Sequence, residues 1–219
     1  MSKIVLIRPG QTDYDDQSRL VGALEMPMNQ AGVEQVDQIV RHLQQEGVQP
    51  EAILTSPSDP ACSAARAIAE ALKGVKVKEL DELKNVNQGL WQGLPETEVR
   101  KRYPQFFRNG REKPQTICPP EGETLGDACE RLQKVLNKAI RKYDVLAIVA
   151  ADPIASVIRC TLQERGLAVA SCLSGENDRQ AVEFLEPGSF ESSLFVNWEC
   201  SGESGQVPAE SGARSTSAQ

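Results

Sequence analysis

Residues 3–12 read KIVLIRPGQT, an apolar run that ends in an arginine, a proline and a glycine. Four aliphatic residues in succession, from Ile4 to Ile7, are typical of a strand that is buried on both faces of a parallel sheet. Arg8 follows the run, and we expect it to project into a binding site at the end of the strand. Pro9 then stands where a chemically useful side chain would be expected.

Two other predicted strands end in comparable turns. EAILTS, residues 51–56, runs into Pro57-Ser58-Asp59-Pro60, and VLAIVA, residues 145–150, runs into Ala151-Asp152-Pro153. Strands are also expected over residues 75–80 and 179–187, and helices over residues 31–46, 60–74, 94–104, 124–140 and 155–166. This alternation predicts an α/β fold: a three-layer sandwich whose mostly parallel sheet carries helices on both faces. The three turns would then meet at one edge of the sheet, where such folds bind ligands.

Two of the helices carry local signals that fix their position. Thr124, followed three residues later by Asp127, is typical of a capping box. The helix over residues 31–46 has an apolar stripe at helical spacing. The stripe consists of Val33, Val36, Ile39, Val40 and Leu43.

Composition limits the class of protein and its partners. The chain has 219 residues and a net charge of −7, and a chain so acidic is not expected to bind nucleic acid or an anionic membrane. No apolar run is long enough to span a membrane, and the N-terminal run is too short for a signal peptide. We therefore expect a cytoplasmic protein with one domain over residues 1–198 and a disordered tail over residues 199–219. Six dispersed cysteines indicate reduced thiols, and one histidine without a ligand cluster argues against a metal site.

Five motifs follow one another along the chain at characteristic spacings. The first is RPGQT, residues 8–12. The second is a set of spaced residues: Gly22, Glu25, Pro27, Met28, Asn29, Gly32 and Gln35. The last three are TSPSDPACSAA (55–65), LKNVNQGLWQG (83–93) and EGETLGDACERL (121–132). Together they resemble the histidine phosphatase superfamily, which includes cofactor-dependent phosphoglycerate mutase. The resemblance covers about residues 1–165 and implies the phosphoglycerate mutase-like fold.

The resemblance also implies a phosphoryl-transfer site, but most of its reactive positions hold other residues. In the family, a histidine is the nucleophile, a second histidine and two arginines bind the phosphoryl group, and a carboxylate is the acid. Here the nucleophile position is Pro9, the second arginine is Pro60 and the acid is Asn85. The second histidine falls on Ala150 or on Ala151, depending on the alignment.

Arg8 is the one charged residue of the family site that remains. With Gly10 and Thr12, it would form a remnant anion site. Loss of a nucleophile alone typically lowers the rate by about 10⁴–10⁶-fold. We therefore expect a non-catalytic member, a pseudoenzyme, that needs no cofactor or metal. It would have a binding or regulatory role toward an unidentified small molecule or protein partner.

The alternative is a phosphatase or other hydrolase whose site was rebuilt around Arg8. Its candidate residues are Glu82, Asp152, Ser56 and Cys62, the last because a thiol near a helix start can have a lowered pKa. A small buried cysteine is the simpler interpretation of Cys62. The chain's one histidine, His42, is expected on the helix surface.

Two expectations concern contacts. A guanidinium that ends a buried strand needs a partner, and the candidates are Asp152, Asp59 and Asp15, one of which would pair with Arg8 in a bidentate manner. The Gly-x-Trp-x-Gly segment at residues 89–93, together with residues 104–122, would form either an interface or a cap on the fold.

Overall fold

The structure is a computed structural model that describes residues 2–106, 118–163 and 180–186. Its centre is a five-stranded sheet made of β1 (Lys3–Ile7), β2 (Ala52–Thr55), β3 (Lys76–Glu79), β4 (Val145–Val149) and β5 (Val182–Leu185). The strand order is β3-β2-β4-β1-β5. All neighbours are parallel except β5, which pairs antiparallel with β1. The predicted α/β class with a mostly parallel sheet is confirmed.

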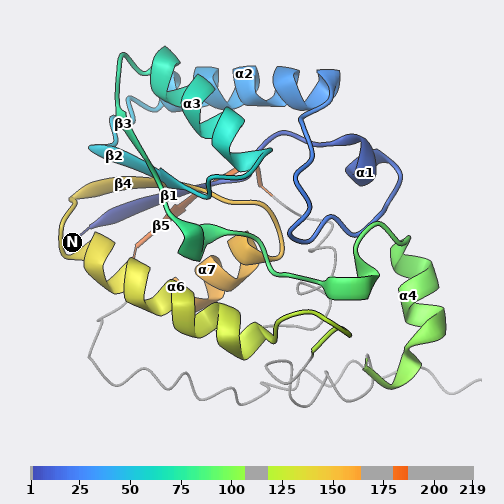
Figure 1. Cartoon of the computed structure of the whole chain (residues 1–219). Helices are drawn as coiled ribbons and strands as arrows, with labels where there is room; N and C mark the ends of the chain where they lie inside the picture. Colours follow the sequence, from blue (N-terminus) through green and yellow to red (C-terminus); the bar gives the residue numbers. More distant parts are fainter. Residues whose placement is uncertain (1, 107–117, 164–179, 187–219) are drawn as a thin grey trace, which may run out of the picture.

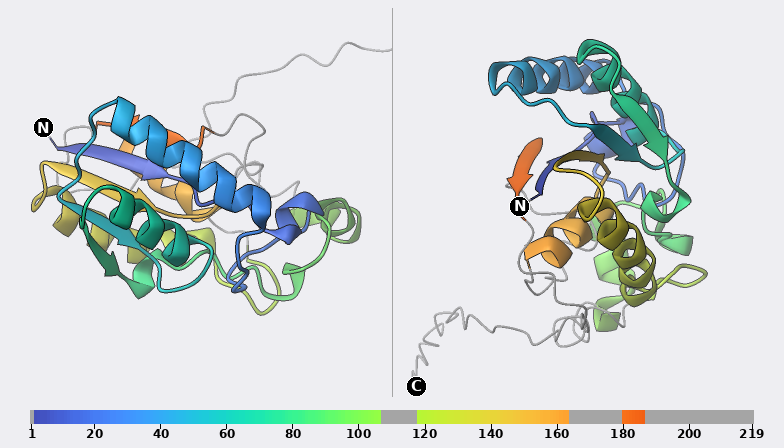
Figure 2. Two further views of the ribbon diagram at one scale, coloured as in Figure 1. Left: turned by 90° about the horizontal axis from the view of Figure 1, so that it is seen from above. Right: turned by 90° about the vertical axis from the view of Figure 1, so that its left-hand side faces the viewer.

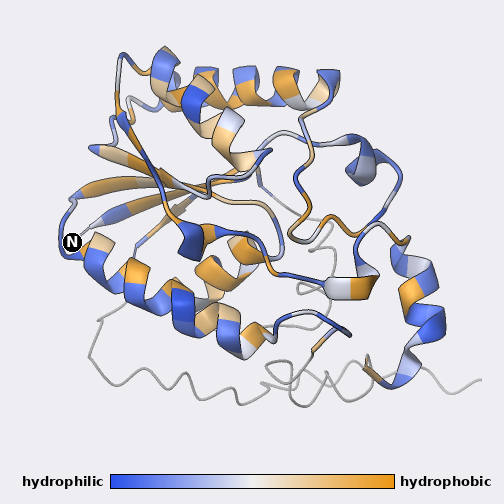
Figure 3. Cartoon of the chain, viewed as in Figure 1, coloured by the Kyte–Doolittle hydropathy of each residue, from blue (hydrophilic) through white to orange (hydrophobic). Residues whose placement is uncertain are grey.

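Helices cover both faces of this sheet (Figures 1 and 2). On one face lie α2 (Gln30–Gln45) and α3 (Ala61–Ala71), and on the other lie α6 (Leu125–Ile140) and α7 (Ile154–Gln163). Alternate residues of β1 supply the two cores, because successive side chains of a strand point to opposite faces. Ile4 and Leu6 pack toward α6 and α7, whereas Val5 and Ile7 pack toward α2 and α3. Figure 3 shows the apolar sides of the helices turned toward the sheet.

Four short elements lie beyond the carboxyl ends of the strands: α1 (Asp13–Asp16), η1 (Asp81–Leu83), η2 (Gly89–Trp91) and α4 (Glu96–Arg102). Two of them, η2 and α4, contribute to a third, small core. Trp91 is fully buried, and its ring centroid lies 5.4 Å from those of both Tyr103 and Phe106. Trp91 therefore packs as a residue of a cap would. Residues 107–117 of the same expectation lie outside the described part of the chain, and the interface stays a prediction.

Most predicted elements appear within one to three residues of their expected bounds. The capping box is confirmed, because Thr124 accepts a hydrogen bond from the Asp127 backbone and Asp127 accepts one from the Thr124 backbone. The placement of Val33 in the apolar stripe is wrong, since it is 45% exposed. The buried positions of α2 are instead Gly32, Val36, Ile39 and Leu43, because Gly32 packs against the neighbouring loop.

Several expectations fall partly outside the described residues. The helix predicted to reach residue 166 is described only to Gln163, and the predicted tail over residues 199–219 is not described at all. Cys62, Cys118, Cys129 and Cys160 are free, while Cys172 and Cys200 lie outside the described part. Among the helices described, none is long and apolar enough to cross a membrane.

Candidate functional site

Arg8 directly follows β1 and is buried, and two of its three guanidinium nitrogens donate hydrogen bonds. Its Nε donates to Asp152 Oδ2 at 2.7 Å, and its Nη1 donates to Glu183 Oε1 and, at 3.0 Å, to the carbonyl of Gln180. Burial would lower the pKa of this guanidinium, but the two carboxylates more than offset that effect and the pKa is raised. Arg8 is therefore a buried cation neutralised from within the chain, and its Nη2 has no partner among the described residues.

One of the three expected carboxylates, Asp152, does pair with Arg8, but the geometry differs from the prediction. Each carboxylate meets a different guanidinium nitrogen, so the contact is not bidentate. Asp59 and Asp15 were wrong candidates because local donors already use them. Asp59 accepts from the backbone and hydroxyl of Ser63, and Asp15 accepts from the backbone and hydroxyl of Thr12.

The turn after Arg8 packs closely against the start of α2. A Cβ on Gly10 would lie 2.0 Å from the carbonyl oxygen of Gly32, and one on Gly32 would lie 2.2 Å from that of Gln11. The turn and the start of α2 thus cross so closely that only glycine fits at both positions. Thr12 is buried, and its hydroxyl donates to Asp15. The remnant anion site of Arg8, Gly10 and Thr12 stays a prediction, and two of these residues have structural roles of their own.

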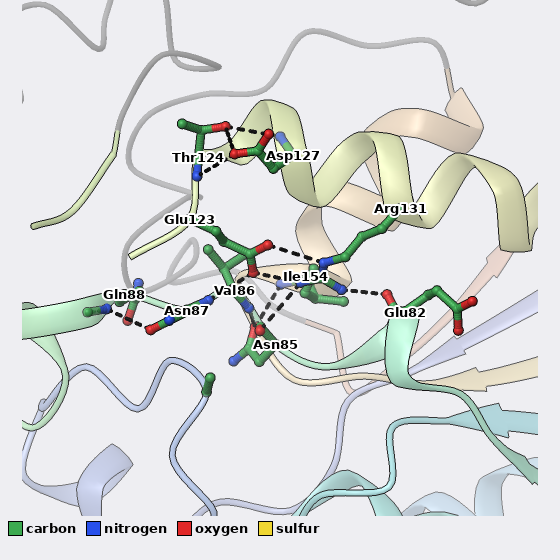
Figure 4. A network of polar contacts seen from close by, with 12 residues as sticks. Glu82, Asn85, Val86, Asn87, Gln88, Glu123, Thr124, Asp127, Arg131 and Ile154 are labelled. Carbon is green, nitrogen blue, oxygen red and sulfur yellow. Dashed lines mark hydrogen bonds and ion pairs between the residues drawn. The ribbon is translucent and has the colours of Figure 1, made fainter. Parts of the chain in front are cut away.

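Asn85 links two segments that are far apart in the sequence. Its Nδ2 donates to the Asp152 carbonyl at 2.7 Å, and its Oδ1 accepts from the backbone of Ile154 at 3.2 Å. Arg131 of α6 in turn donates to the carbonyls of Glu82 and Asn85, and it forms an ion pair with Glu123 (Figure 4). A continuous set of hydrogen bonds therefore runs from α6 through Asn85 to the turn that holds Asp152.

A small cavity of about 40 Å³ lies beside this turn. Pro60, Asn85 and Ala151 line it together with Ser56, Asp59 and residues 21–24. Arg8 and Pro9 are not among its lining residues. Of the two alanines, Ala151 faces the cavity, whereas Ala150 is 1% exposed and belongs to the core that packs on α6 and α7. The second and third strand-end turns thus share a cavity, and Arg8, at the first, contacts Asp152 of the third.

A family model described as the histidine phosphatase superfamily, branch 1, matches residues 4–181. The chain belongs to the histidine phosphatase superfamily. The fold, the order of the motifs and the position of Arg8 at the end of the first strand all agree with that membership.

Some of the proteins to which the chain is similar have phosphatase names. The chain is 27% identical over 143 residues to phosphoserine phosphatase 1 of Hydrogenobacter thermophilus. The match covers 65% of this chain and 66% of that protein. It is 30% identical over 168 residues to the bifunctional protein Rv2228c of Mycobacterium tuberculosis, and this match covers 74% of this chain and 44% of that protein. The chain thus spans about two thirds or less of the length of these relatives.

A solved structure reproduces nearly the whole fold. Bacillus stearothermophilus YhfR superposes with a TM-score of 0.71 at 20% identity, and the match covers 92% of this chain and 98% of that chain. This likeness supports the phosphoglycerate mutase-like fold alone.

The candidates for a rebuilt site are dispersed rather than gathered around Arg8. Cys62 is buried, and the pKa of its thiol is raised by burial and by a hydrogen bond to Glu79; this agrees with the preferred interpretation of a small buried cysteine and not with an activated thiol. Figure 4 shows the Glu82 side chain directed away from Asn85. His42 is exposed on α2, as expected. Among the described residues, no group of three or more histidines, cysteines and carboxylates could hold a metal ion.

Sequence reasoning did not find Glu183, which contributes the second carboxylate to Arg8. Glu183 lies 175 positions further along the chain, and it reaches Arg8 because β5 pairs with β1 at the edge of the sheet. Its one sequence signal is a single acid within the apolar run of residues 181–185. An acid at such a position is common on an edge strand, so the signal is weak.

Proposed function

We propose that the chain is a non-catalytic member of the histidine phosphatase superfamily, with a binding or regulatory role. One observation carries this proposal: the only charged residue kept from the family's site, Arg8, is already neutralised by Asp152 and Glu183. The family's nucleophile position, on this alignment, is Pro9. A phosphoryl group arriving at Arg8 would meet carboxylates instead of a nucleophile and free cations.

The groups around the neighbouring cavity do not replace the lost chemistry. Phosphoryl transfer needs a nucleophile, positive charge on the transferred oxygens and a proton for the leaving group. Ser56 donates to the carbonyl of Ser58, and Ser58 donates to Glu25, so neither hydroxyl is hydrogen-bonded to a histidine base. Asn85 uses both ends of its amide to hold the turn at residues 152–154.

A phosphatase with a rebuilt site is the second candidate function, and kinship favours it. The relatives named above include a phosphoserine phosphatase, so by similarity alone a phosphatase is better supported than a binding protein. Its catalytic group would have to come from Ser56, Cys62, Glu82 or Asp152. The contacts of these side chains support the non-catalytic function, because each is buried, already bonded or directed elsewhere.

Turnover decides between the two functions. We expect purified protein to hydrolyse neither p-nitrophenyl phosphate nor phosphoserine above background, and to form no acid-labile phosphoenzyme. The matched control is Arg8→Lys, which keeps the charge and removes the guanidinium nitrogen Nη1 that donates to Glu183. Turnover by the wild-type protein that falls in Arg8→Lys protein of unchanged circular dichroism would establish the phosphatase and end the non-catalytic proposal.

A further inference from the structure

Glu183 lies between two arginines. It stands on β5 opposite Leu6 of β1, on the face of the sheet that α7 covers. Its Oε1 accepts from Arg8 Nη1, and its Oε2 lies 3.9 Å from Nη1 of Arg159 in α7. Each oxygen of one carboxylate therefore faces a different guanidinium.

The other carboxylate at Arg8 has a different role. Asp152 Oδ2 accepts a hydrogen bond from Arg8 Nε. Its Oδ1 accepts from the backbone and the hydroxyl of Ser156, in the first turn of α7. Asp152 therefore secures the start of a helix as well as an ion pair. Glu183 has no such second role, because its contacts within the described residues are with Arg8 and Arg159 alone.

We propose that Glu183 is an internal substitute for a phosphate, which fills an anion site formed by Arg8 and Arg159. Two guanidinium groups that converge on one acceptor group are a common way to bind a phosphoryl group or another tetrahedral oxyanion. Arg159 lies outside the five motifs that carry the resemblance to the family, the last of which ends at Leu132. The inference rests on the non-catalytic function proposed above, and it explains how the site persists without a phosphorylated ligand.

The charges around Arg8 explain why a free anion would not bind there in the wild-type chain. Arg8, Arg159, Asp152 and Glu183 carry two positive and two negative charges, so among the described residues the cluster is neutral. The side chain of Glu183 is only 12% exposed, and a ligand would have to displace it from Arg8. A tethered carboxylate is always present at high effective concentration, so it competes strongly with a free anion. Neutralising Glu183 would remove the competitor and leave a net positive charge.

Binding of inorganic phosphate to the wild-type chain and to Glu183→Gln protein tests this inference. Glutamine keeps the shape of the side chain and removes its charge. We expect calorimetry at fixed ionic strength to show phosphate binding that is at least about tenfold tighter in the variant. In Glu183→Gln/Arg159→Met protein this gain should disappear, because the second guanidinium is gone.

The control is Glu79→Gln, which makes the same change in net charge on β3, at the opposite edge of the sheet. It should leave phosphate binding as in the wild type. If Glu183→Gln protein is unfolded in buffer, phosphate and not chloride should refold it, because binding stabilises the folded state. Equal binding in wild type and Glu183→Gln, a gain that survives Arg159→Met, an equal gain in Glu79→Gln or refolding by neither salt would overturn the inference. Each outcome is a binding result, so it is distinct from the turnover that would overturn the non-catalytic function.

Discussion

Replacing Arg8 by methionine should destabilise the protein strongly. The substitution leaves Asp152 and Glu183 buried without their main cation, their side chains being 4% and 12% exposed. Removal of one partner from a buried ion pair typically costs about 3–5 kcal/mol. With a urea dependence of about 2 kcal/mol per molar, the midpoint of unfolding should fall by about 1.5–2.5 M. Urea titration followed by far-ultraviolet circular dichroism measures this shift.

The control and the compensated variant define the cause. Arg66→Met removes an ion pair of equal length, 2.7 Å to Glu79, but an exposed one, so its midpoint should move far less. Adding Asp152→Asn and Glu183→Gln to Arg8→Met should restore most of the lost stability, because no charge then stays buried without a partner. An Arg8→Met protein as stable as the wild type would refute the structural role of Arg8 and imply that the arginine is kept for a ligand.

Three further predictions concern backbone packing, thiol reactivity and the α6 network. Gly32→Ala should destabilise by about 1–3 kcal/mol in urea, although alanine favours helices, because its Cβ would lie 2.2 Å from the Gln11 oxygen; a stabilised variant would contradict the close crossing. Burial raises the pKa of the Cys129 thiol to about 12, so at pH 8 peptide mapping should show iodoacetamide on exposed Cys118 well before Cys129, and equal rates would refute this. Arg131→Met should cost about 2 kcal/mol in urea, since it removes the ion pair to Glu123 and two bonds to carbonyls, while a change no larger than that of exposed Lys134→Met would refute the role.

Local patterns predicted most of the fold because they depend on few distant contacts. The apolar run at Ile4 to Ile7 is buried, as expected, and the Thr124 capping box forms because its two residues are three positions apart. Val33 was wrongly placed on the buried face of α2, because the helical spacing of the apolar residues is compatible with either Gly32 or Val33 at the first buried position. Gly32 is the buried residue because the backbone of Gln11 packs against it, and this contact between distant residues forms only when the chain folds.

The site was predicted less completely, because its contacts join distant segments. Asp152 could be proposed as a partner of Arg8 since both follow adjacent strands of a parallel sheet. Glu183 could not be proposed, because its position depends on the antiparallel register of β5. The hydrogen bonds of Asn85 were also missed. An amide at the acid position indicated lost chemistry, whereas the structure shows it tying residues 152–154 to the segment before η2.

The motif residues that survive in this chain are largely those that the packing requires. Gly89 and Gly122 illustrate this, because a Cβ on the first would lie 2.0 Å from the Pro120 oxygen and one on the second 2.5 Å from the Asn87 oxygen. Trp91 is likewise needed as the centre of the third core. Such residues maintain similarity to phosphatases whether or not a phosphoryl group is ever transferred. A level of identity near 30% is therefore compatible with an inert site, and kinship alone carries little weight on the chemistry. The informative positions are those of the reactive groups: the resemblance implies that Pro9 stands where the nucleophile would be, and we propose that Glu183 takes the place of a bound phosphate.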